Sequence, residues 1–226
     1  LKGTGLDIVR QVIRDQHDLL VKAAHPTEVV RRVLFGHTDR QLIRKCPCPV
    51  WINKTDPKAD HDRILAAIDL EPLENESDQE RDREQLNALI LQCAIVIAQA
   101  EQAELHVLHV WPFDLEGPLD SRAGMSAESI SQIGEAIKQK HNEALHRVIR
   151  PYRQHIAEVH LIKGQAEHEI PQFVTSQSVD LVVMGTLSRS GVAGLLIGNT
   201  AETVLDQIDC SLLAMKPPGF TSPVKG

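Results

Sequence analysis

The stretch VDLVVMGTLSRSGVAGLLIGNTAETVLDQI, residues 179–208, joins three kinds of segment. Residues 179–185 are a short apolar run, which is typical of a buried β-strand. A loop with several glycines follows, and from Gly198 the apolar residues have helical spacing. A buried strand followed by a helix is the repeating unit of a parallel sheet that is covered on both faces. This stretch therefore predicts an α/β protein.

The same alternation runs through most of the chain. Strands are expected at 62–70, 104–110, 157–163, 179–185 and 211–216, and helices at 77–102, 126–149, 167–177 and 198–208. Pro171 is expected in the first turn of the third of these helices, where a proline removes no hydrogen bond. Five strands alternating with four helices predict a complete doubly wound unit with a five-stranded parallel sheet.

The chain also contains an internal repeat. A shift of 162 positions (17 to 179) places HDLLVKA on VDLVVMG, Gly36 on Gly198 and Cys48 on Cys210. The first copy holds only the last third of the unit, with helices at 7–16 and 37–46 and strands at 17–23 and 49–54. We therefore expect an incomplete first domain at 1–54, a linker at 55–61, a complete domain at 62–218 and a tail at 219–226. The first domain is expected to be truncated, unobserved or completed by another chain.

Composition limits the classes of function. Hydrophobic residues make up 42% of the 226 residues but aromatic residues only 3%, so the core is expected to be aliphatic. The net charge of −7 argues against broad binding to nucleic acid, because no basic excess is present to neutralise phosphates. No run of eighteen apolar residues and no signal-peptide pattern occurs, so we expect a soluble, cytoplasmic protein without membrane contact.

The cysteines form no C-x-x-C pair. Cys46 and Cys48 flank a proline in KCPCPVW, which admits a redox or metal-binding interpretation. We favour a structural role at a helix-to-strand junction, in a reducing compartment.

Residues 60–218 resemble the universal stress protein family in full order, and the tandem arrangement with GNTAE is similar to its E type. Nucleotide-binding members carry an acid after the first strand and a loop G-x2-G-x9-G-(S/T) between the fourth strand and the fourth helix. Here the acid is Asp69, and Gly185 and Gly198 match the first and third glycines. Ser188 replaces the middle glycine and Asn199 the Ser or Thr, so two loop positions depart. The resemblance implies the adenine-nucleotide α-hydrolase-like fold, with strand order 3-2-1-4-5.

The resemblance also implies an adenine nucleotide, ATP with Mg²⁺, held as a regulatory ligand without dedicated catalysis. The acid is expected to hold the ribose or the base, and the start of the fourth helix can face phosphates with its N–H groups. In such a sheet the crevice lies where the winding reverses, which independently brings the ends of the first and fourth strands together. The expected nucleotide-binding residues are Asp69, Val110, Met184, Gly185, Ser188, Arg189, Gly198, Asn199 and Thr200. No catalytic residue is expected.

Each of these features has an alternative. Asn199 with Glu202 three positions later can simply cap a helix. The first copy keeps Gly36 but has Ala23 and Pro26 at the upstream glycine positions, so the helix start is needed even without a nucleotide. The crevice could instead hold an amphiphile or a nucleotide-sugar conjugate, with Leu195 and Leu196 lining it, or the protein could be a ligand-free interaction scaffold.

The eleven histidines show no helical metal-binding pair. His106 and His109 differ by three positions on an expected strand and should point to opposite faces, so no metal site is expected. The expected partners are a small-molecule ligand and a second domain or chain. A homo-oligomer or an intramolecular pseudo-dimer through the fifth strands is predicted, for which Val50-Trp51-Ile52 offers an edge.

Overall fold

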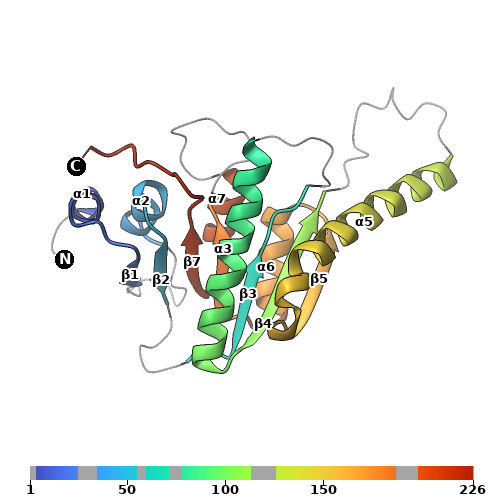
Figure 1. Ribbon diagram of the computed structural model, residues 1–226, viewed down its shortest axis with the longest axis horizontal. Helices are drawn as coiled ribbons and strands as arrows, with labels where there is room; N and C mark the ends of the chain where they lie inside the picture. Colours follow the sequence, from blue (N-terminus) through green and yellow to red (C-terminus); the bar gives the residue numbers. More distant parts are fainter. Residues whose placement is uncertain are drawn as a thin grey trace.

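The computed structural model describes residues 4–24, 35–54, 60–71, 78–112, 126–186 and 198–225. These residues form one sheet with helices on both faces (Figure 1). The strands are β1 (Leu20–Ala23), β2 (Val50–Asn53), β3 (Arg63–Ala67), β4 (Glu104–Trp111), β5 (Glu158–Lys163), β6 (Leu181–Gly185) and β7 (Ser211–Met215). The helices are α1 (Gly5–Asp15), α2 (His37–Lys45), α3 (Asp78–Glu101), α5 (Ala127–Ile149), α6 (Ala166–Ser176), α7 (Asn199–Gln207) and the 3-10 helix η1 (Arg150–His155). The predicted α/β class with a mostly parallel sheet is confirmed.

The strand order in the sheet is β1-β2-β7-β6-β3-β4-β5. The sheet has seven strands rather than the five predicted for one unit, because the two strands of the N-terminal segment join it. Neighbouring strands are parallel except β2 and β7, which are antiparallel. From β3 the chain builds outward through β4 to β5 and then returns to the other side of β3 as β6. The winding therefore reverses between β3 and β6.

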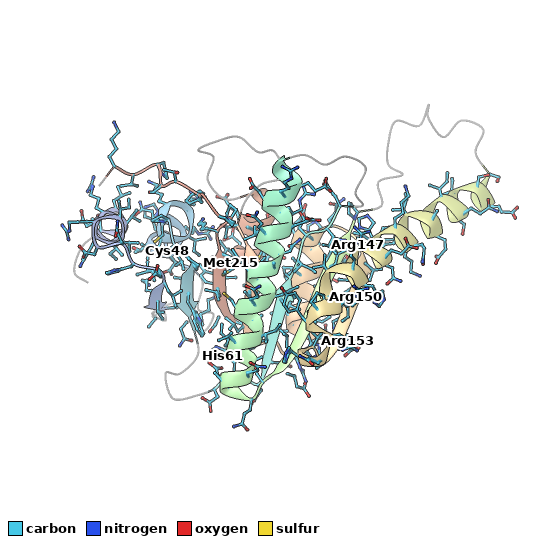
Figure 2. The ribbon with its side chains drawn as sticks, viewed as in Figure 1. Cys48, His61, Arg147, Arg150, Arg153 and Met215 are labelled. Carbon is cyan, nitrogen blue, oxygen red and sulfur yellow. The ribbon has the colours of Figure 1, made fainter. Side chains whose placement is uncertain are left out.

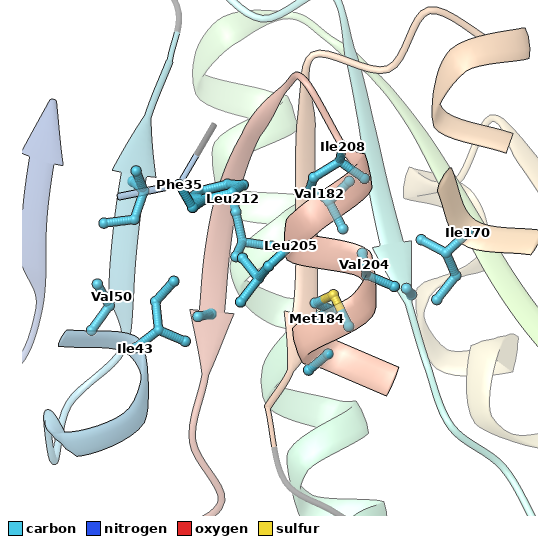
Figure 3. Close-up of a cluster of buried hydrophobic side chains, with 14 of the residues drawn as sticks. Phe35, Ile43, Val50, Ile170, Val182, Met184, Val204, Leu205, Ile208 and Leu212 are labelled. Atoms are coloured by element: carbon cyan, nitrogen blue, oxygen red, sulfur yellow. The ribbon is translucent and has the colours of Figure 1, made fainter. Parts of the chain in front are cut away.

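Two hydrophobic clusters, one on each face, explain why the inner strands are almost continuously apolar. Alternate residues of β3 point to opposite faces, so Leu65 belongs to the cluster under α1, α2, α6 and α7, whereas Ile64 belongs to the cluster under α3 and α5. Figure 3 shows the first cluster running from Val50 on β2 through Leu212 on β7 to Ile170 on α6. A parallel sheet needs this cover on both faces, which β6 and β7 receive along their length.

The N-terminal segment is joined to the rest through the edge of β7. Val50, Trp51 and Ile52 pair with Ala214, Leu213 and Leu212. Helices α2 and α7 lie on the same face near this joint, and two ion pairs connect them. These are Arg40 with Asp206 and Arg44 with Glu202. One core cluster continues across the joint, so the two segments share a hydrophobic interior.

The helix boundaries follow the sequence pattern closely, with one correction. The predicted helix at 126–149 is observed as Ala127–Ile149, and that at 77–102 as Asp78–Glu101. Pro171 does not lie in the first turn of α6, because the helix begins at Ala166 and the proline is inside it. It forgoes one intrahelical hydrogen bond, but it is buried against the sheet, where its ring adds apolar contact.

Candidate functional site

A crevice with a volume of about 490 Å³ lies at the carboxyl ends of β3 and β6. Its walls come from the residues after β3, the start of α3, the end of β4, the start of α6 and the start of α7. These segments meet because β3 pairs with β6 in parallel, with Ala67 opposite Met184. Ligands in open parallel sheets bind at such a reversal of winding, because the loops on either side diverge there and leave a gap.

Six of the nine residues predicted from sequence line this crevice. They are Asp69, Val110, Met184, Gly185, Gly198 and Thr200. Ser188 and Arg189 lie outside the described residues, as do Leu195 and Leu196. Asn199 is the first residue of α7, and its side chain is outside the described part.

The backbone of Asp69 is held in place by a buried asparagine on α3. Asn87 accepts a hydrogen bond from Asp69 N at 3.1 Å and donates one to Asp69 O at 2.7 Å. The Asp69 carboxylate is 41% exposed and lies 3.9 Å from Arg83 Nε, while Arg83 also donates to Glu71 at 2.7 Å. Arg83 and Asn87 are four residues apart, so they lie on the same face of α3. Together they aim the acid at the mouth of the crevice.

Gly185 has a structural reason to be glycine that is independent of any ligand. A Cβ atom at this position would lie 2.8 Å from Leu86 Cδ2 on α3. The absence of a side chain lets α3 approach the end of β6 closely. The glycine that matches the family motif is therefore needed for helix packing, and by itself it is weaker support for a nucleotide than the sequence suggested.

The N-cap of α7 lies one residue before Asn199, the position that the sequence predicted for it. Gly198 rather than Asn199 is the N-cap residue, and its own N–H donates to Thr186 O at 3.0 Å. Glu202 does not close a capping box, because it lies one residue too far along and pairs with Arg44 instead. The first N–H groups of an α-helix lack intrahelical acceptors, so this end of α7 can present donors toward the crevice.

The charges around the crevice are mainly acidic. Among the described lining residues, Asp69, Asp82 and Glu167 carry carboxylates, and Arg83 is the cation. Glu167, in the first turn of α6, accepts a hydrogen bond from Thr200 Oγ1 at 3.4 Å. Sequence reasoning missed Glu167 because α6 is remote from the glycine loop along the chain. A phosphate next to Thr200 would meet this carboxylate unless a cation lies between them.

Comparison with known proteins decides the family. The sequence profile of the universal stress protein family matches residues 4–54 and 61–216. The chain belongs to this family. As a universal stress protein it is similar to universal stress protein E of Photorhabdus laumondii, with 30% identity over 220 residues, and to that of Escherichia coli, with 31% identity over 219 residues. These matches cover 96% of this chain but 67% and 66% of the relatives. The chain thus spans about two thirds of their length.

Solved structures agree with the family and the fold. A putative universal stress protein from Pseudomonas aeruginosa has a TM-score of 0.73 at 28% identity, covering 96% of this chain and 69% of that one. A functionally unknown protein from the same species has a TM-score of 0.74 at 28% identity and the same coverage. A universal stress protein from Archaeoglobus fulgidus, at 18% identity, has a TM-score of 0.56 and supports the fold alone.

Four histidines of this universal stress protein form two pairs, one on each face of the sheet. The spacing of histidines along the sequence did not predict these pairs. His106 Nδ1 lies 2.9 Å from His160 Nε2, and the two rings are stacked. On the opposite face, His109 Nε2 lies 2.9 Å from Nδ1 of His141 on α5. His106 and His109 thus face opposite ways, as predicted, but each finds a partner on another element.

The first of these pairs also lies close to a carboxylate. Ligand atoms of His106, His160 and Glu158 lie within 4.8 Å of one another, a spacing that can hold a metal ion. Spacing rules missed this group because its members come from two strands, β4 and β5. Burial lowers the pKa of His160, which favours its neutral form.

No helix among the described residues is both long and apolar enough to cross a membrane.

Proposed function

We propose that this universal stress protein binds ATP with Mg²⁺ in the crevice between β3 and β6, as a regulatory ligand without dedicated catalysis. One observation carries the proposal: the crevice brings the acid after β3 and the start of α7 to the same space, although they are far apart in sequence. Its volume of about 490 Å³ falls within the range of small-molecule and cofactor sites.

The proposal assigns separate roles to the two ends of the crevice. Asp69 accepts hydrogen bonds from the ribose hydroxyls or the adenine amine, and Asn87 keeps its backbone in position. Val110 and Met184 are buried and flank the base. The N–H groups at the start of α7, with the Thr200 hydroxyl, face the phosphates, where the helix dipole also favours negative charge.

The acidic lining of the crevice explains why the proposed ligand is ATP together with Mg²⁺. Mg²⁺ prefers oxygen ligands and is commonly held by one or two carboxylates together with substrate phosphates. Glu167 lines the crevice and accepts a hydrogen bond from Thr200, which is expected to face the phosphates. The ion would lie between this carboxylate and the phosphates, so that an acid that repels free ATP assists the binding of MgATP.

Isothermal titration calorimetry of the full chain with ATP, with and without Mg²⁺, tests this function. We expect binding that requires Mg²⁺, and an affinity reduced about tenfold or more by Asp69→Asn, which removes a charged hydrogen-bond acceptor. Glu167→Gln should weaken the binding of MgATP, because a carboxylate that would hold Mg²⁺ is lost. It should strengthen the binding of free ATP, because the same carboxylate repels the phosphates. Glu135→Gln, an exposed acid on α5, is the matched control and should change neither. Absence of binding at millimolar MgATP would refute the proposal.

A second candidate is a different ligand in the same crevice, such as an amphiphile or a nucleotide-sugar conjugate. The apolar part of the lining favours it, since Leu108, Ile170 and Leu86 form a wall without charge next to the acidic mouth. Native mass spectrometry of freshly purified protein separates the candidates, because a retained mass far from that of ATP supports this one. A third candidate, a ligand-free scaffold, predicts that Asp69→Ala leaves all function intact.

We also propose that the protein acts in the cytoplasm as an intramolecular pseudo-dimer or a homo-oligomer. The antiparallel pairing of β2 with β7 supports the first form. The outer edge of β1, where Leu19 and Val21 are exposed, supports the second, because an unpaired strand edge favours association. Light scattering of the full chain distinguishes them, since a concentration-independent monomer mass would exclude the homo-oligomer.

A further inference from the structure

The two cysteines of the turn between α2 and β2 have their sulfur atoms in direct contact. Cys46 Sγ and Cys48 Sγ are 3.5 Å apart, with Pro47 between them in sequence. Both are free thiols, 0% and 7% exposed (Cys48 is labelled in Figure 2). A disulfide needs a sulfur–sulfur distance near 2.05 Å, so the two atoms must close by roughly 1.5 Å, which side-chain rotation and small backbone adjustments can supply.

A buried lysine supplies positive charge next to this pair. Lys216, just after β7, is 5% exposed, and its Nζ donates to Ile43 O and to Thr186 Oγ1, the latter at 2.8 Å. Burial lowers the pKa of Lys216 to about 8, and the neighbouring thiols oppose that effect. Near pH 7 the ammonium is therefore the main form, and it can stabilise a nearby thiolate.

The two thiols are not equivalent. The hydrogen bond from Cys48 lowers the pKa of Cys46, and the Lys216 ammonium lowers it further. The same hydrogen bond and burial raise the pKa of Cys48. The lowered pKa favours Cys46 as the thiolate, with Cys48 as the thiol that donates the hydrogen bond. An attacking thiolate beside a second thiol is the arrangement that a two-step oxidation needs.

A surface groove leads to the pair. It has a volume of about 650 Å³ and is formed by the end of α1, the cysteine turn and the C-terminal segment. Cys48 lines it together with His17, Asp18 and Phe220. Cys46 does not line the groove and is 0% exposed, so a small oxidant is better suited to reach it than a bulky one. This groove is separate from the crevice between β3 and β6, because the two have no lining residue in common.

The geometry points to a peroxide-sensitive dithiol at Cys46-Pro47-Cys48, which closes reversibly to an intrachain disulfide. The Cys46 thiolate attacks one oxygen of hydrogen peroxide, the O–O bond breaks, and the leaving hydroxide takes up a proton to become water. The Cys48 sulfur then gives up its proton and attacks the Cys46 sulfenic acid. The S–O bond breaks and a second water leaves, so that two thiols supply the two electrons that reduce the peroxide.

Oxidation at this place changes the turn between α2 and β2, close to the joint between the two segments. Cys46 ends α2, where its N–H donates to Leu42 O at 2.9 Å, and Cys48 lies two residues before β2. The strand that follows pairs with β7, and Lys216 reaches from the end of β7 back to Ile43 of α2. The disulfide therefore constrains the turn that leads from α2 into β2, the strand that pairs with β7.

Peroxide treatment of the full chain tests the site. The protein is oxidised with hydrogen peroxide for increasing times, then unfolded in denaturant with excess N-ethylmaleimide, digested and analysed by mass spectrometry. We expect the peptide holding Cys46 and Cys48 to become unlabelled and two hydrogen atoms lighter, and dithiothreitol to restore labelling. Cys93 and Cys210 are internal controls, because burial raises the pKa of both thiols and they should remain labelled. Loss of label at the same rate at all four cysteines would overturn the proposal.

Variants separate the roles of the three residues. Cys48→Ser should leave a sulfenic acid on Cys46 that dimedone traps when the oxidised protein is unfolded in its presence, whereas Cys46→Ser should give little adduct on Cys48. Lys216→Met should slow disulfide formation about tenfold, the change in thiolate fraction for one pKa unit. Lys54→Met is the matched control, since Lys54 is half-buried, also has a pKa that burial lowers to about 8, and neighbours Cys210 instead. Equal rates of disulfide formation in the two lysine variants would refute the proposed role of Lys216 in activating the thiol. Circular dichroism shows whether each variant is folded.

Discussion

Replacing Gly185 by alanine tests whether this glycine serves helix packing or ligand binding. A Cβ atom would lie 2.8 Å from Leu86 Cδ2 and 3.7 Å from Ile90 Cδ1. Favourable carbon contacts begin at about 3.5 Å, so the end of the Leu86 side chain must move by roughly 0.7 Å. Overpacking costs about 1–3 kcal/mol, and we expect about 1 kcal/mol because Leu86 is only partly buried and can rotate.

Urea unfolding of four proteins measures this cost: the wild type, Gly185→Ala, Leu86→Ala and the double variant. If the contact with Leu86 causes the loss, alanine at position 185 should lower the free energy of unfolding in the wild type but not in the Leu86→Ala background. The double-mutant cycle should then give a coupling energy of about 1 kcal/mol.

The opposite outcome would be equally clear. If Gly185→Ala leaves the free energy of unfolding unchanged but abolishes MgATP binding, then the packing explanation is wrong and the glycine serves the ligand. If the cost is the same in both backgrounds, the strain lies in the backbone and not at Leu86.

Three further outcomes follow from the described contacts. Asn87→Ala should cost roughly 2 kcal/mol in urea unfolding, because two hydrogen bonds to the Asp69 backbone are lost, and it should also weaken MgATP in calorimetry. Arg44→Met breaks the ion pair with Glu202, but both side chains are about a third exposed (36% and 35%), so we expect less than about 1 kcal/mol, and less still at high salt. Because the pKa of Lys216 falls from 10.5 to about 8 on folding, the folded protein releases this proton first, and its contribution to the free energy of unfolding rises between about pH 8 and 10.5. The difference in stability between the wild type and Lys216→Met should follow this rise with a slope of at most about 1.4 kcal/mol per pH unit, and a difference that is constant with pH would contradict the assignment.

Much of the fold could be predicted because local patterns determine it. The helix at Ala127–Ile149 and the strand at Leu181–Gly185 follow from the spacing of apolar residues and the positions of proline and glycine. The convergence of Asp69 and Gly185 followed from one topological rule, that parallel strands end at the same edge of a sheet. Two predictions at helix ends were wrong. Pro171 lies inside α6 and not in its first turn, and the N-cap of α7 is Gly198 and not Asn199. Helix ends are difficult to predict because caps compete weakly and locally.

The contacts that give the candidate sites their chemistry could not be predicted in the same way. Glu167 comes to Thr200 because α6 and α7 pack on the same face, and His160 comes to His106 because β5 pairs with β4 in one particular register. Neither distance is visible in the spacing along the chain. The Cys46–Cys48 pair was visible as a motif, but its chemistry depends on Lys216, which lies far away in the sequence.

The sequence by itself determined the family, the α/β class, the places of most helices and strands, and the acid that follows β3. These depend on periodicity and on short-range propensity, which are properties of neighbouring residues. The tertiary structure alone decided that two segments share one seven-stranded sheet, that Asn87 holds Asp69, that Leu86 leaves little room for a side chain at position 185, and that Lys216 reaches Ile43 of α2. These depend on which faces pack together, because burial brings distant side chains within a few ångströms and changes their charge and reactivity.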